Sequence, residues 1–276
     1  LQFGYTEEAR QFIEWFGSYQ FDNGKIPCVV DHRGAEPTPE HDSHGEYIFM
    51  VAEYYRYTKN LKWLEAQFPR VLKAVEYIEH LLAQNTRQEP HLKGILPPSI
   101  SHEGYSDKPA YSNWDNFLCL KGLEDAVFLS EELHTASLLE TARKGKMNLQ
   151  NVTARLTVRR DSFRQALIDS LKASMTHHGI DFIPGSADRG DFDATSTTIA
   201  IDPCLQLPAL RDELAKTFDK WWTFFLMRRG NQLQWADYTP YELRQVGAFI
   251  RLGQWARAHE ALDWFFAHRR PLGWRH

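Results

Sequence analysis

Residues 99–122 read SISHEGYSDKPAYSNWDNFLCLKG, and this stretch passes from a polar, aromatic loop straight into an apolar helix. The helix predicted from Trp114 to Leu133 is apolar on most of its sides. A helix of this kind is an inner helix, covered by protein on more than one side. The loop before it carries imidazole, carboxyl and aromatic groups, which a simple helix connection does not need. The alternative interpretation is an ordinary long connection with a capped helix start.

The same succession of polar loop and apolar helix recurs along the chain. Four loops rich in Gly, Pro, Asp and aromatic residues cover residues 21–42, 97–113, 179–194 and 230–239. No segment alternates well enough to predict a strand of convincing length, so the predicted class is all-α. The rhythm predicts an array of helical hairpins whose long loops gather at one end, where a site is expected.

Periodicity and capping signals predict about nine helices. Their approximate ranges are 6–19, 40–60, 61–84, 114–133, 136–176, 194–201, a helix after 208, 240–252 and 255–269. We expect Thr6, Ser43 and Thr239 to cap helices. Pro69 predicts a kink or two abutting helices, and residues 145–151 predict a break.

Composition excludes several classes of partner. The 276 residues are enough to bury a sizeable core, and the net charge of −4 is small with interspersed signs. Neither nucleic acid nor a membrane surface is therefore an expected partner. No apolar run approaches the ~20 residues of a membrane span. The chain begins without Met and shows no signal peptide, so we expect a partial or processed chain, with cytoplasm and periplasm both open as locations.

Motifs for cofactors and metals are absent from the sequence. There is no GxSxG, GxGxxG or Walker motif, so no cofactor is expected. His41, His44 and Glu46 form the strongest metal alternative, but the two histidines straddle a helix start and have no recognised zinc spacing. No metal site is predicted. The three cysteines lack CxxC spacing and are expected to be buried free thiols.

Carboxyl groups are present in all four long loops. The set is Asp31, Glu40, Asp42, Glu103, Asp107, Asp115, Asp188, Asp191, Asp193, Asp237 and Glu242. Aromatic rings stack on the C–H surfaces of sugars, and carboxylates bind sugar hydroxyls. The aromatic residues interleaved with these carboxyl groups therefore indicate a carbohydrate cleft. Glycoside cleavage needs one protonated and one ionised carboxyl group. At Asp115 the helix dipole favours ionisation and apolar neighbours oppose it, which leaves its protonation state open.

Four segments together resemble bacterial members of the six-hairpin glycosidase superfamily, which includes trehalase-like, processing glucosidase-like and glucoamylase-like enzymes. These segments are PEHDSHGEY (39–47), PPSISHEGYSDKPAYSNWDNF (97–117), IPGSADRGDFDATSTT (183–198) and YTPYELRQVGAFIRLGQWARA (238–258). The resemblance implies an (α/α)6-toroid-like fold, which has twelve helices when complete. With about nine helices, residues 1–276 are expected to be a single toroid-like domain, incomplete as a toroid and a fragment of a longer protein.

The resemblance also implies site residues. It places the general acid at Asp115, with Glu103 as the nearest alternative, and sugar contacts in the four loops. The expected contacts are Arg33, Asp42, His102, Tyr105, Trp114 and Tyr241. In many relatives the second carboxylate comes from a late inner helix that this chain does not reach, so its partner is predicted among Glu103, Asp193 and Glu242, with Asp237 as a further alternative.

These observations predict a glycoside hydrolase, or a phosphorylase relative, that acts on a carbohydrate substrate without a cofactor. One alternative is a non-catalytic helical module that binds glycan or protein, motivated by the missing helices and the uncertain second carboxylate. Another is a lyase-type α-toroid, for which GDFDA (190–194) is a faint aspartate-rich motif.

Overall fold

The computed structural model describes residues 1–100, 108–139, 148–204, 207–233 and 240–268, and these residues form an all-α fold. The helices are α1 (Thr6–Gly17), α2 (Asp42–Thr58), α3 (Leu61–Gln84), α4 (Asn113–Leu139), α5 (Leu149–His178), α6 (Ala194–Thr197), α7 (Arg211–Arg229), α8 (Arg244–Arg251) and α9 (Trp255–Ala267). Short 3-10 helices are η1 (Thr198–Ala200), η2 (Pro208–Leu210) and η3 (Pro240–Leu243). Within the described ranges the only sheet is the antiparallel hairpin of β1 (Val30–Asp31) and β2 (Gly34–Ala35).

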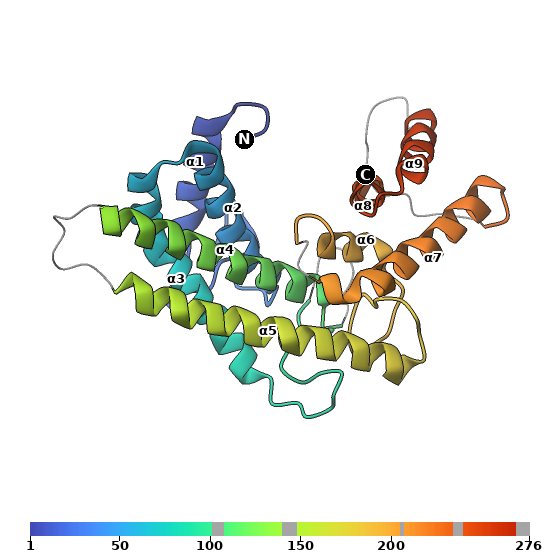
Figure 1. The fold of residues 1–276 in the computed structure, drawn as a ribbon, viewed down its shortest axis with the longest axis horizontal. Coiled ribbons are helices and arrows are strands. Elements are labelled where there is room, and N and C mark those ends of the chain that lie inside the picture. Colours follow the sequence, from blue (N-terminus) through green and yellow to red (C-terminus); the bar gives the residue numbers. More distant parts are fainter. Residues whose placement is uncertain (101–107, 140–147, 205–206, 234–239, 269–276) are drawn as a thin grey trace.

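Helix α4 is the inner helix of the first half of the chain. It packs against α2, α3 and α5, and runs alongside α5 for most of its length (Figure 1). Phe117, Leu120 and Leu123 are among its fully buried side chains. Burial on several sides explains why this helix shows no single apolar stripe, as its sequence predicted.

Two glycines let α2 and α4 approach each other closely. A Cβ atom added at Gly122 would lie 2.6 Å from the Cα atom of Gly45, and one added at Gly45 would meet the Leu118 backbone. Real Cβ atoms do not come this close to a backbone atom, so no other residue fits without a shift of the helices. The glycines therefore set the separation of the two helices that carry Asp42 and Asp115.

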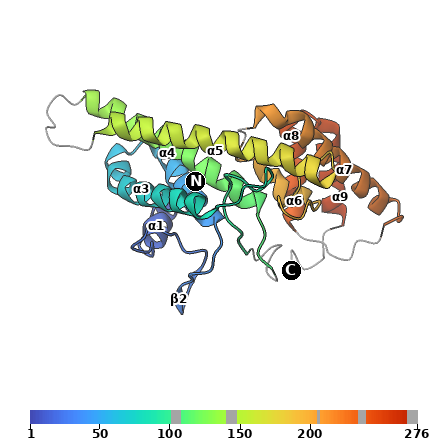
Figure 2. The ribbon, with the colours of Figure 1, turned by 90° about the horizontal axis from the view of Figure 1, so that it is seen from below.

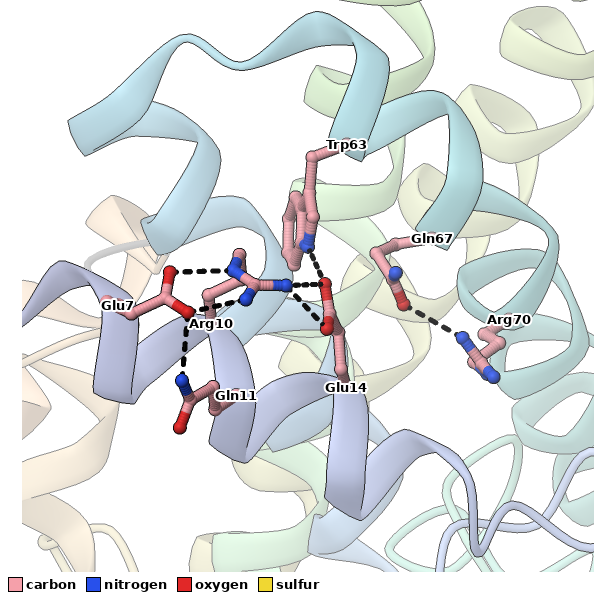
Figure 3. Close-up of polar contacts among 7 residues, drawn as sticks. All are labelled: Glu7, Arg10, Gln11, Glu14, Trp63, Gln67 and Arg70. Atoms are coloured by element: carbon pink, nitrogen blue, oxygen red, sulfur yellow. Dashed lines mark hydrogen bonds and ion pairs between the residues drawn. The ribbon is translucent and has the colours of Figure 1, made fainter.

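Helix α1 is attached to α3 by a polar network. Arg10 bridges Glu7 and Glu14, and Glu14 also accepts a hydrogen bond from the Trp63 indole at 2.8 Å (Figure 3). Buried Ile13 lies on the same helix. This network links α1 to α3, and α1 also packs against α2.

The second half of the chain gathers around the N-terminal end of α4. Helices α6 to α9 lie together at one side (Figures 1 and 2), and both α6 and η1 contact α4. Their core is aromatic, with Trp221, Trp222, Phe225 and Phe249 in mutual ring contact. The predicted all-α array of hairpins is thus confirmed, in a toroid-like arrangement.

Several helix boundaries differ from the predictions. Helix α4 continues to Leu139 and α5 begins at Leu149, so residues 136–139 belong to the earlier helix. Pro69 lies inside one continuous helix, α3, because the other backbone hydrogen bonds and the buried apolar face keep that helix together. The predicted caps at Thr6 and Ser43 are wrong, since the helices start after Tyr5 and His41 without a side-chain cap.

The prediction of buried free thiols is confirmed for two of the three cysteines, and one predicted cap lies outside the described residues. Cys119 and Cys204 are buried free thiols, whereas Cys28 is half-buried. Thr239 lies outside the described ranges. None of the helices that the structure describes has the length and apolar character needed to cross a membrane.

Candidate active site

The second and third long loops are joined at the start of α4. The backbone N–H of Asn113 donates to Gly185 O, and the N–H of Ala187 donates to Tyr111 O, both at 2.9 Å. At the base of the second loop, Ser99 and Ala110 exchange a pair of backbone hydrogen bonds. These contacts hold the residues just before Asp115 in a defined backbone geometry.

Asp115 lies in the first turn of α4 and is only 1% exposed. Its carboxyl group accepts hydrogen bonds from Ser99 Oγ at 2.5 Å and from Ser112 Oγ at 3.3 Å. Burial raises the pKa of Asp115 well above its usual range, and the charge of Asp42 raises it further, against the lowering effect of the two serines. Burial is the largest of these effects, so the surroundings of Asp115 shift its carboxyl group towards the protonated form.

Asp42, the first residue of α2, carries a negative charge that raises the pKa of Asp115. It is half-buried, and its Oδ2 atom accepts a hydrogen bond from Trp114 Nε1 at 2.8 Å. Since Trp114 and Asp115 are neighbours in the chain, the indole bond ties the two acidic residues into one site. The first and second loops therefore converge here.

An arginine connects this site to the last part of the chain. The guanidinium of Arg244, at the start of α8, lies 4.8 Å from the Trp114 ring centre and 4.6 Å from the Tyr241 ring centre. A cation between two aromatic faces is attracted by both ring quadrupoles. Tyr241 is 37% exposed, so one aromatic wall of the site is accessible. Three predicted site residues, Asp42, Trp114 and Tyr241, are thus brought together with Asp115.

No protein-family model matches the sequence, and no curated protein matches it. The chain shares its fold with a rhamnosidase. That solved structure, "rhamnosidase from Klebsiella oxytoca with rhamnose bound", matches with a TM-score of 0.60 at 12% sequence identity, over 95% of this chain. The match covers 45% of the rhamnosidase chain, and at this identity the likeness concerns the fold alone.

The other carboxyl groups predicted as partners of Asp115 are held by structural contacts. Asp193 caps α6, accepting from Ser196 N at 2.9 Å and from Ser196 Oγ at 2.5 Å. Glu242 is buried and accepts two hydrogen bonds from Arg228 Nη1, at 2.9 and 3.1 Å. Burial raises the pKa of Glu242 while Arg228 lowers it. The catalytic roles of both carboxyl groups stay predictions.

The remaining predicted residues are not brought into this site by any described contact. Arg33, between β1 and β2, is exposed and pairs with Asp31 in a hairpin that projects from the helices (Figure 2). His102, Glu103 and Tyr105 lie outside the described residues, as do Asp107 and Asp237.

Two buried histidines lie within two residues of Asp42 in the sequence. His41 is 4% exposed, and burial together with the charge of Lys25 lowers its pKa to about 4. His44 is fully buried, and its Nδ1 accepts from the Ile26 N–H at 3.2 Å. Both rings are neutral at neutral pH. In the described part of the chain, no group of three or more His, Cys, Asp or Glu side chains is arranged to hold a metal ion.

Sequence reasoning did not assign Ser99, Ser112 or Arg244 to the site. The helix-start pattern placed Ser112 or Asn113 at the cap of this helix, and the Asp115 N–H donates to Ser112 Oγ at 3.3 Å, so only the contact of Ser112 with the Asp115 carboxyl group was not predicted. Ser99 and Arg244 have no local signal, because each reaches its partner across the fold.

Proposed function

We propose that this chain is a glycoside hydrolase-like domain that cleaves a glycosidic bond by carboxylate acid–base catalysis, without a cofactor. One observation carries the proposal. A deeply buried carboxyl group with a raised pKa, Asp115, lies beside the half-exposed carboxyl group of Asp42 and an aromatic wall. The fold shared with a rhamnosidase supports it.

In the proposed reaction Asp115 is the general acid. An acid must hold its proton at the working pH and release it to the leaving-group oxygen, which a raised pKa favours. Asp42 binds sugar hydroxyls and disfavours early loss of the Asp115 proton through its charge. The sugar ring stacks on the exposed face of Tyr241, and Trp114 and Arg244 support that wall.

The partner carboxylate, which activates water or attacks the anomeric carbon, is proposed among Glu103, Asp193 and Glu242. For Glu242 to serve, its bonds with Arg228 would have to exchange for bonds with water or sugar. For Asp193, the cap of α6 would have to open.

The first experiment measures release of 4-nitrophenol from a panel of 4-nitrophenyl glycosides, α-L-rhamnoside included, by the 276-residue chain. We expect Asp115→Asn to lower kcat/KM by about a hundredfold or more, since general acid catalysis contributes at least this much. The matched control is Asp161→Asn, which changes an exposed carboxylate of α5 paired with Arg160 and Arg164. Unchanged hydrolysis in the Asp115 variant would exclude Asp115 as the acid.

The second candidate function is carbohydrate binding without catalysis. The observation that favours it is the 1% exposure of Asp115, since an acid must touch the leaving oxygen. Calorimetric titration with monosaccharides separates the candidates. Binding that is weakened by Tyr241→Ala, in a chain that releases no nitrophenol from any glycoside, would support the binding module. Turnover sensitive to Asp115→Asn would support the hydrolase.

A further inference from the structure

Ser99 makes the tightest hydrogen bond to Asp115 among the residues that the structure describes. Ser99 Oγ donates to Asp115 Oδ2 at 2.5 Å. Ser112 Oγ lies 3.3 Å from the other oxygen, Oδ1, and also accepts the Asp115 N–H at 3.3 Å. Strong hydrogen bonds between oxygen atoms are about 2.5–3.0 Å long, so only the bond from Ser99 is strong. The two oxygens of the Asp115 carboxyl group are therefore not equivalent.

Backbone hydrogen bonds fix the segment that carries Ser99. Ser99 and Ala110 exchange N–H···O bonds, both at 2.9 Å. Three residues before Ser99, the Leu96 N–H donates to Asn116 Oδ1 at 3.0 Å. Because Asn116 follows Asp115 in α4, this segment is attached to the same helix turn as the carboxyl group. Ser99 is also fully buried, so its hydroxyl group is shielded from exchange with bulk water.

The charged groups that act on Asp115 are on the first loop and at the start of α2. Asp42 and Glu40 both raise the pKa of the Asp115 carboxyl group, although burial raises it most. On α4 itself, burial raises the pKa of the Cys119 thiol well above its usual range, so this group is neutral at neutral pH. The two serine hydroxyl groups act in the opposite direction, since they donate to the carboxyl oxygens. An ionised Asp115 thus depends on the hydroxyl groups for its stabilisation.

We propose that Ser99 is a positioning residue, which holds Oδ2 of Asp115 and leaves Oδ1 as the oxygen that carries the transferable proton. In a protonated carboxyl group one oxygen carries the proton and the other accepts hydrogen bonds. Oδ2 accepts from Ser99 at 2.5 Å, so the proton belongs on Oδ1. The bond from Ser99 stands on this geometry, whereas the transfer of the proton rests on the proposed function.

The assignment defines the proton transfer in the proposed reaction. The Oδ1 proton passes to the glycosidic oxygen while the bond from that oxygen to the anomeric carbon breaks, and the electron pair of the bond stays on the oxygen. Water, the second substrate of hydrolysis, supplies the hydroxyl group that joins the anomeric carbon and a proton that returns to solvent. Asp115 is left as a carboxylate, and the bond from Ser99 becomes a stronger, charge-assisted one.

The test is the titration of the Asp115 carboxyl carbon by NMR in the whole chain, labelled with carbon-13 aspartate, between pH 4 and 10. The Asp115 signal is assigned by its absence from Asp115→Asn. Because Ser99 donates most strongly to the ionised form, Ser99→Ala should raise the pKa of Asp115 by about one unit or more. An unchanged pKa would overturn the proposal. A lowered pKa would also overturn it, because Asp115 would then be the donor and Ser99 the acceptor.

Ser170→Ala is the matched control. Ser170, on α5, is also fully buried, and its hydroxyl group donates to His91 O at a similar distance, 2.6 Å. This change should leave the pKa of Asp115 where it is, and a shift equal to that of Ser99→Ala would overturn the proposal. Ser99→Cys keeps a side chain of similar size with a weaker donor, so it should give a smaller shift in the same direction. It serves as the test variant if Ser99→Ala does not fold.

The dependence of kcat/KM on pH gives a second measurement in an active chain. The loss of rate at high pH reports ionisation of the acid in the free enzyme. Ser99→Ala should move this loss to higher pH by the same amount as the NMR titration. A rate lowered equally at every pH would show that Ser99 is merely structural.

The NMR titration needs no substrate, so its failure and that of the proposed hydrolase are distinguishable. A raised pKa of Asp115 in Ser99→Ala, in a chain that hydrolyses nothing, keeps Ser99 as the group that holds the carboxyl group and removes the enzyme. An unchanged pKa in an active chain removes the role of Ser99 and keeps the enzyme.

Discussion

Asp115 is a buried carboxyl group whose raised pKa bears both on its proposed role as an acid and on the stability of the fold. Its surroundings are two serine hydroxyls and a second carboxyl group, and its pKa is raised mainly by burial. A carboxyl group with a raised pKa can hold a proton for donation, but the same shift costs free energy of folding at a pH where the unfolded chain ionises the group. Sites with this property are typical of functional residues, although structural networks also produce them.

This cost leads to a prediction on stability. An acid whose folded-state pKa is raised binds more protons in the folded than in the unfolded state between the two pKa values, so stability falls as pH rises through that window. In Asp115→Asn this contribution is absent, and we expect a higher free energy of unfolding at pH 7 and a flatter dependence on pH above 4. Urea denaturation at pH 5, 6, 7 and 8 measures both quantities. A variant that is less stable than the unchanged chain at every pH would show that Asp115 is stabilising.

At the level of elements, the crossing of α2 and α4 determines the geometry of the site. Asp42 begins one helix and Asp115 lies in the first turn of the other, and Gly45 and Gly122 allow the two backbones to touch. A wider separation would move the carboxyl groups apart and stretch the bond from Trp114 to Asp42. The glycines are thus part of the site although they carry no chemistry.

The prediction at this scale concerns Gly122→Ala. The added methyl group would meet the Gly45 backbone at 2.6 Å, so we expect overpacking to cost about 1–3 kcal/mol of stability. The matched control is Gly247→Ala in α8, where an added Cβ has nothing within 4 Å and helix propensity should stabilise by up to about 1 kcal/mol. Urea denaturation compares the two. Stabilisation of the chain by both changes would contradict the close approach of α2 and α4.

For the whole molecule, buried neutral histidines predict sensitivity to acid. A base whose folded-state pKa is lowered contributes stability above its unfolded pKa, and this is lost as pH falls. For His41 the fall from 6.5 to about 4 corresponds to about 3 kcal/mol, and His44 acts in the same direction. Asp115 acts in the opposite direction. We expect the histidine contribution to be lost between pH 6.5 and 4.

The measurement is the free energy of unfolding at pH 7, 5.5 and 4.5 for the unchanged chain and for His41→Gln. The variant should lose less stability on acidification than the unchanged chain. His80→Gln, at an exposed position of α3, serves as the control and should follow the unchanged chain. An identical pH dependence in all three would exclude His41 as a source of acid sensitivity.

The sequence by itself determined the all-α class, the loop-then-helix order and the inner character of α4, because helical periodicity and apolar patterning are local properties of the chain. It also brought Asp42, Trp114, Asp115 and Tyr241 forward as site residues. Only the tertiary structure decided that burial governs the protonation of Asp115, and that Ser99, Asp42 and Arg244 are the groups around this site. The reason is physical: a pKa depends on desolvation and on charges contributed by segments distant in the sequence, and these distances exist only after folding.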